Sequence, residues 1–173
     1  VQVSALFESL DRVDHLVICA GTVGQGAVVR SSVETLRGVI DQRLWGVVMA
    51  VRGAVPRMSG GGSITLTSGG LTSRPVAGRA MYVAVLAAVE ALARGLAVEL
   101  APIRVNCIVP GAVATPLQGS RPEDLARLEQ LGSRLPAGRV GTADDLAQVY
   151  LLAMTNGYLT GEVLHVDGGG RFV

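Results

Sequence analysis

Hydrophobic and polar residues follow two different spacings along the chain. Apolar residues recur every three to four positions in five segments, which is the spacing of a helix face. Four shorter apolar runs lie between or after these segments, and such runs are typical of strands. We therefore expect helices at residues 1–14, 31–58, 81–100, 122–131 and 142–154, and strands at 15–21, 63–69, 103–111 and 162–170.

Local signals support several of these boundaries. Ser32 is a candidate N-cap for the second helix. Thr142 and Asp145 stand at the spacing of a capping box before the last helix. The glycines of SGGG at 59–62 are expected to interrupt the chain before the next strand. The first strand, HLVICAG at 15–21, is apolar enough to be expected buried on both faces.

Strands that alternate with helices indicate an α/β fold with a parallel sheet covered by helices on both faces. The chain, residues 1–173, has the length of one domain. Ligands of such sheets bind outside the carboxyl ends of the strands. Here those ends read CAGT at 19–22, TSGG at 67–70, VPGAVATP at 109–116 and VDGGG at 166–170.

Charge is sparse and of an unusual kind. Charged residues make up 17% of the chain, the net charge is +1, and all 15 basic residues are arginines, because the sequence contains no lysine. The arginines are scattered, whereas a nucleic-acid surface needs clustered basic residues. We therefore expect no nucleic-acid partner.

The longest apolar stretch, residues 82–98, contains Glu90 and Arg94. Each charge would cost about 2.5–3.5 kcal/mol at a membrane centre, so a buried helix of a cytoplasmic protein is expected rather than a membrane span. Cys19 and Cys107 lie in apolar runs and are expected to be buried. The chain shows no metal-ligand spacing.

The stretch ALARGLAVELAPIRVNCIVPGAVATPL at 91–117 resembles the short-chain dehydrogenase/reductase family. HLVICAG, GSITLTSG at 62–69 and TGEVLHVDGGG at 160–170 are similar to three further motifs of that family, in the same order and at similar spacing. The resemblance implies a doubly wound, Rossmann-type sheet, NAD or NADP as cofactor, and a small-molecule carbonyl or alcohol as substrate. It also implies a homodimer or homotetramer.

Family members have three further strands before the motifs found here. Those strands carry the glycine-rich turn that holds the cofactor pyrophosphate at a helix N-terminus. We therefore expect this chain to be the C-terminal part of a Rossmann-type domain, with four strands and their flanking helices. The resemblance also implies which residues contact the cofactor. These are Ala20, Gly21, Pro110, Gly111, Val113 and Thr115.

The catalytic residues of the family are only partly retained. In the family, a tyrosine exchanges a proton with the substrate oxygen, and a lysine four residues later lowers the pKa of that tyrosine. Tyr82 matches the tyrosine, but Leu86 stands at the lysine position. A serine that orients the substrate would fall on Gly69 by spacing, with Ser68 one residue away. The family's asparagine, just before LWG, is Arg43.

Two interpretations follow from this mixed pattern. The first is an NAD(P)-dependent oxidoreductase in which Tyr82 is the acid/base and Ser68 orients the substrate oxygen, with Arg43 or Arg79 as a substitute positive charge. The alternative is a weakened or inactive family member kept for ligand binding or oligomer assembly. A hydrolase elbow at Ser68 is excluded, because Leu66 stands where that motif requires glycine.

Overall fold

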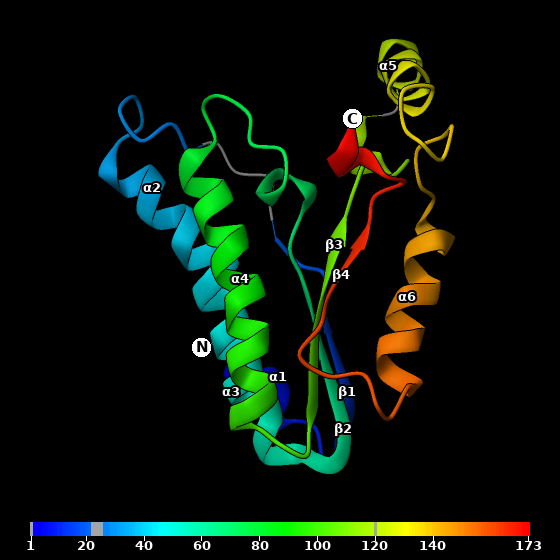
Figure 1. Ribbon diagram of the computed structural model, residues 1–173. Coiled ribbons are helices and arrows are strands. Elements are labelled where there is room, and N and C mark those ends of the chain that lie inside the picture. The colour runs from blue at the N-terminus through cyan, green and yellow to red at the C-terminus, as the bar shows by residue number, and fades with distance from the viewer. Residues whose placement is uncertain (1, 22–25, 120) are drawn as a thin grey trace.

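The computed structural model describes residues 2–21, 26–119 and 121–173. Four strands form one sheet in the order β1-β2-β3-β4, and every neighbouring pair is parallel. The strands are β1 (Val13–Ile18), β2 (Met58–Thr67), β3 (Arg104–Pro110) and β4 (Val163–Val166). This arrangement confirms the predicted parallel α/β sheet (Figure 1).

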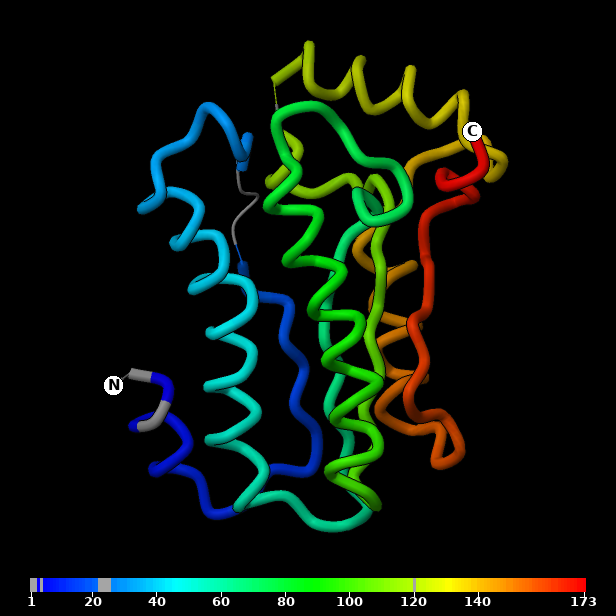
Figure 2. Tube along the Cα trace, turned by 60° about the vertical axis from the view of Figure 1, so that its left-hand side comes forward, coloured from blue at the N-terminus to red at the C-terminus, as the bar shows by residue number. Residues whose placement is uncertain are grey.

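Helices cover both faces of the sheet, as Figures 1 and 2 show. On one face lie α2 (Val33–Ile40), α3 (Gly46–Ala54) and α4 (Ala80–Glu99), with the short α1 (Gln2–Glu8) packed on α3. On the other face lies α6 (Ala143–Thr155), which contacts β2 and β3. Helix α5 (Pro122–Gly132) lies beyond the carboxyl ends of the strands.

The predicted caps are present. The Ser32 hydroxyl accepts a hydrogen bond from the Thr35 N–H at 3.2 Å at the start of α2. At the start of α6, the Thr142 hydroxyl accepts from the Asp145 N–H, and the Asp145 carboxylate accepts from the Thr142 N–H at 2.7 Å. These bonds satisfy backbone donors that have no partner inside the helix.

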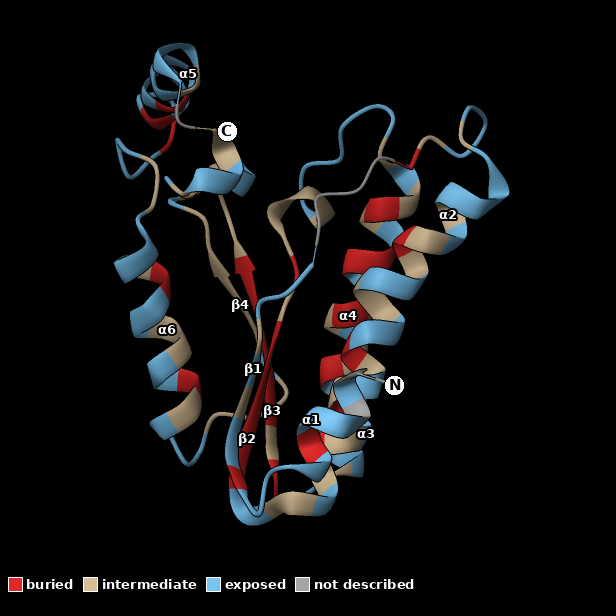
Figure 3. Cartoon of the chain, turned by 180° about the vertical axis from the view of Figure 1, so that it is seen from behind, coloured by how far each residue is buried: buried red, intermediate tan, exposed pale blue. Residues whose placement is uncertain are grey.

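The main core lies between the sheet and helices α3 and α4. Ile64, Leu66 and Val105 from the sheet pack there against Val89 and Ala93 of α4, and all five are at most 1% exposed. Figure 3 shows this buried stripe along α4 and the central strands. By length and composition alone α4 would also suit a membrane span, but the core helix of a soluble domain meets the same criterion.

The predicted helix at 31–58 is divided into α2, a π-helical turn, α3 and a 3₁₀ turn. Between α2 and α3 the chain forms a π-helical turn at Asp41–Trp45, in which the Gly46 N–H donates to the Asp41 carbonyl. A 3₁₀ turn at Val55–Arg57 then ends the segment. Local apolar spacing cannot reveal the π-helical turn, because it adds one residue to a helix without ending it.

The glycines at 59–62 do not interrupt the chain as expected, because β2 begins at Met58 and runs through them. The register shifts here, so that one residue of β1, Asp14, lies opposite four of β2, residues 59–62, between the Val13–Met58 and His15–Ser63 pairs. A side chain at Gly62 would meet the backbone oxygen of Asp14 at 2.9 Å, so this irregular pairing needs glycine.

Strand β1 is not buried on both faces, and that expectation was wrong. Val17 is 37% exposed and the pattern along β1 is mostly exposed. The physical reason is position: β1 is an edge strand of this sheet, with α3 on one side only. Cys19, directly after β1, is correspondingly exposed, whereas Cys107 on the central β3 is buried as predicted.

Candidate active site

A pocket of about 560 Å³ lies at the carboxyl ends of the strands, next to the start of α4. The sheet therefore places its cavity where ligands of parallel α/β sheets bind. Its lining includes the sequence candidates Gly21, Ser68, Tyr82, Leu86, Pro110 and Gly111, together with Arg43, Gly69 and Arg79. Of the other three cofactor-binding candidates, Ala20, Val113 and Thr115, none is a lining residue.

Tyr82 lies in the first turn of α4 with its ring in the core and its hydroxyl at the pocket. The side chain is 4% exposed and packs with Val39, Val85 and Leu86. The Tyr82 hydroxyl accepts a hydrogen bond from Nη2 of Arg43 at 2.7 Å. The Arg43 guanidinium also lies 5.4 Å from the centre of the Tyr82 ring. The tyrosine therefore has a cationic partner, although not from its own helix.

Leu86 stands one helical turn after Tyr82, where the resemblance places lysine. Its side chain is 1% exposed and belongs to the same apolar cluster as Tyr82, against which Leu71 also packs. This side of the tyrosine is consequently apolar. A lysine at this position would enter a buried environment, where an unpaired charge is costly.

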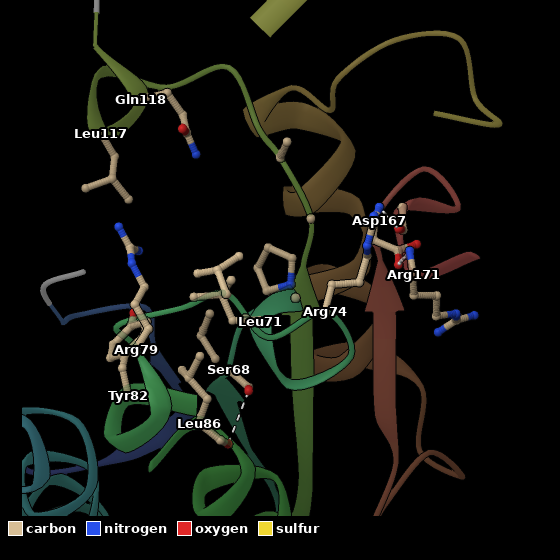
Figure 4. A pocket seen from close by; sticks show the side chains of 18 of the residues that line it. Ser68, Leu71, Arg74, Arg79, Tyr82, Leu86, Leu117, Gln118, Asp167 and Arg171 are labelled. Atoms are coloured by element: carbon tan, nitrogen blue, oxygen red, sulfur yellow. Dashed lines mark hydrogen bonds between the residues drawn. The ribbon is translucent and has the colours of Figure 1, made fainter. Parts of the chain in front are cut away.

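The Ser68 hydroxyl is bonded to Leu86 and Glu90 of α4 rather than to the Tyr82 hydroxyl. It lies 2.8 Å from the Glu90 carboxylate and 3.2 Å from the Leu86 carbonyl oxygen, and Figure 4 shows the latter contact. The serine predicted to orient the substrate thus has its hydroxyl bonded within the fold. Gly69, at the family's serine position, lines the pocket without a side chain.

The segment after β3 offers backbone groups to a ligand. Val113 forms an isolated parallel bridge with Gly141, through bonds made by its neighbours Ala112 and Ala114. The N–H and C=O of Val113 itself have no hydrogen-bond partner among the described residues. The Thr115 hydroxyl is likewise without a partner in that part of the chain. Such free groups suit a polar ligand group like a carboxamide.

Gly21 lies close to the Arg43 side chain, and this contact, like a bound ligand, requires a residue without a side chain. Its φ of 146° lies in a region that side chains disfavour, and a Cβ there would lie 2.6 Å from the guanidinium carbon of Arg43. The arginine therefore passes directly over Gly21 on its way to Tyr82. The absence of a side chain at Gly21 is what leaves room for this path.

The pocket is positively charged. Its charged lining residues, within the described ranges, are Arg43, Arg74, Arg79, Arg171 and Asp167. Asp167 already accepts hydrogen bonds from the backbone N–H groups of Gly169 and Arg171, and Arg74 donates to the Gly170 carbonyl. Arg79 has no side-chain partner in the described part of the chain, and Figure 4 shows it extending into the pocket toward Leu117.

A second tyrosine near the pocket has a different character. Tyr150 on α6 shares a hydrogen bond of 2.7 Å with the hydroxyl of Thr67, which lines the pocket. Burial raises the pKa of Tyr150 well above its ordinary value, so this phenol stays protonated. Tyr82 is therefore the better acid/base candidate. No group of metal-ligating side chains occurs among the described residues.

The role of Arg43 was the main feature that sequence reasoning did not resolve. It was considered beside Arg79 as a possible charge, but only the structure shows which arginine contacts Tyr82. One signal was present in the sequence: two family positions change together, asparagine to Arg43 and lysine to Leu86. The sequence therefore shows one basic residue gained and one lost at positions that the family uses for catalysis.

A family sequence profile described as enoyl-(acyl carrier protein) reductase matches residues 2–170. The chain is 36% identical over 165 residues to the "Short-chain dehydrogenase/reductase ucsE" of Acremonium sp, covering 91% of this chain and 62% of that protein. It is also 36% identical to the "3-oxoacyl-[acyl-carrier-protein] reductase FabG" of Thermotoga maritima, over 96% of this chain and 70% of that protein.

Solved structures agree with these sequence matches. A small-chain dehydrogenase in complex with NADPH superimposes with a TM-score of 0.91 at 41% identity, covering 99% of this chain and 80% of that one. The chain spans less than two thirds of the length of the Acremonium relative. The profile match over residues 2–170 includes every residue that lines the pocket except Arg171.

Proposed function

This chain belongs to the short-chain dehydrogenase/reductase family, and we propose that it contributes the catalytic part of an NAD(P)-dependent oxidoreductase that interconverts a carbonyl and an alcohol. The observation that carries this proposal is the Tyr82 hydroxyl, which lies at the strand-end pocket beside a cationic partner. A tyrosine retained only for packing would not need a charged partner at its hydroxyl.

In the reducing direction Tyr82 donates its proton to the substrate oxygen as the carbonyl carbon gains hydride, and in the oxidising direction it accepts that proton. The nicotinamide, when bound, supplies or accepts the hydride. The chain's own contribution is to hold the substrate oxygen next to Tyr82 and to shield it with the apolar walls formed by Leu71 and Leu86.

The residues present fit the nicotinamide end of such a cofactor. The partnerless backbone groups of Val113 and the free Thr115 hydroxyl suit its carboxamide, and Pro110 and Gly111 form the adjoining pocket wall. Ala20 and Gly21 would lie along the remaining part of the cofactor. The described residues contain no glycine-rich turn that leads from a strand into a helix, so we assign no residue here to the pyrophosphate.

The charge of the pocket points to a substrate with an anionic group. Four lining arginines face one aspartate that is already bonded to backbone N–H groups. Arg79 extends into the cavity from the start of α4 and is the side chain placed to meet a carboxylate or phosphate. We therefore propose a keto or hydroxy compound that carries such a group.

The test is an assay of the full-length protein with NADH and NADPH against paired ketones, each offered as a free acid and as its neutral ester. We expect reduction of the acids to exceed that of the esters, and Tyr82→Phe to lower kcat about 100-fold or more in a protein that stays folded, destabilised only by the loss of the hydrogen bond from Arg43. Equal rates for the parent and Tyr82→Phe would refute the catalytic role and favour the alternative, a binding or assembly protein.

We also propose a homodimer or homotetramer. Supporting this, an apolar groove lies between α3 and α4, lined by residues that include Val48, Val55 and Leu92. On the same two helices Met49 is 41% and Val98 82% exposed, so apolar surface remains for a second copy. A cytoplasmic location, and partners that include neither nucleic acid nor membrane, stay predictions from composition.

A further inference from the structure

We propose that Arg43 is the cation that stabilises the ionised form of Tyr82 and fixes the direction of its hydroxyl. In this chain it would replace the lysine that the family places at position 86. This inference deepens the proposed function, because it assigns the positioning residue that acts through Tyr82. It rests on the contact between the two side chains rather than on any motif.

The contact is short and involves a charged donor. Nη2 of Arg43 lies 2.7 Å from Oη of Tyr82, and the phenol is almost completely buried. Hydrogen bonds from a cationic donor are about twice as strong as neutral ones, and burial reduces screening by water. When Tyr82 gives up its proton, the resulting negative charge would form directly beside the guanidinium.

The bond also has a defined direction. A guanidinium carries only donors, so the Tyr82 oxygen must accept and its own proton must point away from Arg43. Both side chains line the pocket. The tyrosine is therefore held ready to donate to an oxygen in the cavity, which is the arrangement that reduction of a carbonyl requires.

The π-helical turn at Asp41–Trp45 contains Arg43 and joins the two halves of the helix that packs against α4. Such turns occur often at functional sites. The next residue, Leu44, packs against the main core and anchors the turn on that side. Arg43 lines the pocket. Gly21 leaves the space through which the arginine passes.

Other charged groups near the pocket do not contact the phenol. Arg79 precedes Tyr82 on α4, and Arg74, Asp167 and Arg171 face the pocket from the loop after β2 and from the C-terminal segment. Cys19, directly after β1, also lines the pocket. Glu90 of α4 accepts from Ser68. From α2, the apolar residues Val39 and Ile40 belong to or pack against the cluster that contains Tyr82.

The test measures the ionisation of Tyr82 in the ligand-free protein by ultraviolet titration of its phenolate. The chain has three tyrosines, so the difference between the parent and Tyr82→Phe isolates the signal of Tyr82. The same difference is measured in an Arg43→Gln background and in an Arg37→Gln background. Arg37 is an exposed arginine on α2 and serves as the matched control.

Because the variant lacks the cationic donor to the phenol, we expect the midpoint in Arg43→Gln to lie at higher pH than in the parent, and the midpoint in Arg37→Gln to be unchanged. An unchanged midpoint in Arg43→Gln would overturn the proposal. Arg43→Asn is a second neutral variant with the family's own residue, and it provides the same measurement should Arg43→Gln fail to fold. Because the titration needs no substrate, its result is independent of whether the proposed reaction is found.

A charge-relocation series then tests the role in catalysis. In Arg43→Asn, the basic limb of the pH profile of kcat/KM should move to higher pH, in the same direction as the midpoint of the titration. Adding Leu86→Lys to Arg43→Asn restores a cation one helical turn from Tyr82, and we expect it to recover at least about tenfold in kcat/KM. Leu86→Met in the same background keeps the side chain apolar and should recover nothing. A lysine variant no more active than the methionine variant would contradict an electrostatic role.

Discussion

Gly111 offers a direct test of whether the glycine after β3 serves the fold or the cofactor. The family resemblance assigns it to the cofactor, but the structure shows a closer neighbour. A Cβ at Gly111 would lie 2.5 Å from Cα and 2.8 Å from Cβ of Asp167. The Gly111 N–H also donates to the Val166 carbonyl at 2.9 Å, which ties β3 to β4 at the pocket wall. Gly111→Ala should therefore destabilise the protein even without cofactor.

The cost can be worked from this geometry. Ordinary contact begins at 3.4 Å, so the two segments must separate by 3.4 − 2.5 = 0.9 Å. Asp167 cannot move freely, because its carboxylate holds the N–H groups of Gly169 and Arg171. Overpacking typically costs about 1–3 kcal/mol, and weakening the hydrogen bond to Val166 adds up to about 1 kcal/mol. We expect a net loss of about 2–3 kcal/mol, which lowers the melting temperature by about 4–12 °C.

Gly69→Ala is the matched control, since Gly69 follows β2 and lines the same pocket. A Cβ at Gly69 would meet the Leu86 side chain at 3.5 Å, which is ordinary contact, and its extended backbone suits any residue. Its stability should stay within about 1 kcal/mol of the parent. Thermal unfolding of the ligand-free variants decides the matter. If Gly111→Ala melts within 2 °C of the parent (about 1 kcal/mol or less), the steric argument is wrong and the cofactor explanation stands alone.

Two further predictions concern the rest of the molecule. Burial raises the pKa of the Cys107 thiol to about 12, whereas Cys19 is exposed. A thiol reagent should therefore label one cysteine quickly in the native protein and none in Cys19→Ser. Labelling of Cys107 at the same rate as Cys19 would contradict the described burial. The apolar groove between α3 and α4 predicts self-association, so sedimentation at micromolar concentration should show a dimer or tetramer. Val48→Glu, in the groove, should shift the protein toward monomer, whereas Val76→Glu, at an exposed residue away from the groove, should not. A monomeric parent would argue against the interface.

Whether this chain is an active enzyme or an inactive relative depends on how Leu86 and Arg43, the two departures from the family pattern, are interpreted. Taken separately, the loss of lysine at Leu86 and of asparagine at Arg43 both weaken the catalytic set. In the structure the Arg43 guanidinium meets the Tyr82 hydroxyl, so under the proposal above the two departures would compensate each other. The serine position lacks any comparable substitute, since the Ser68 hydroxyl is bonded to Glu90 and the Leu86 carbonyl.

The sequence by itself determined the architecture of this protein. Alternating apolar runs and helical segments predicted the parallel sheet and its helices, and the Ser32 and Thr142 caps marked two helix starts correctly. These features are predictable because they are local. Apolar periodicity records which face of an element meets the core, and a cap involves residues three positions apart. The rule that ligands of parallel sheets bind outside the carboxyl ends of the strands likewise predicted where the pocket lies.

Only the tertiary structure decided how the chemistry is arranged. The bond between Arg43 and Tyr82 joins residues 39 positions apart on two helices, and it depends on how these helices pack and on the π-helical turn between them. The closeness of Gly111 to Asp167 depends in the same way on the pairing of β3 with β4. Periodicity in the sequence reports burial, but it does not specify which distant side chains meet. That is set by the packing of whole elements, and this packing gives Tyr82 a cation without a lysine.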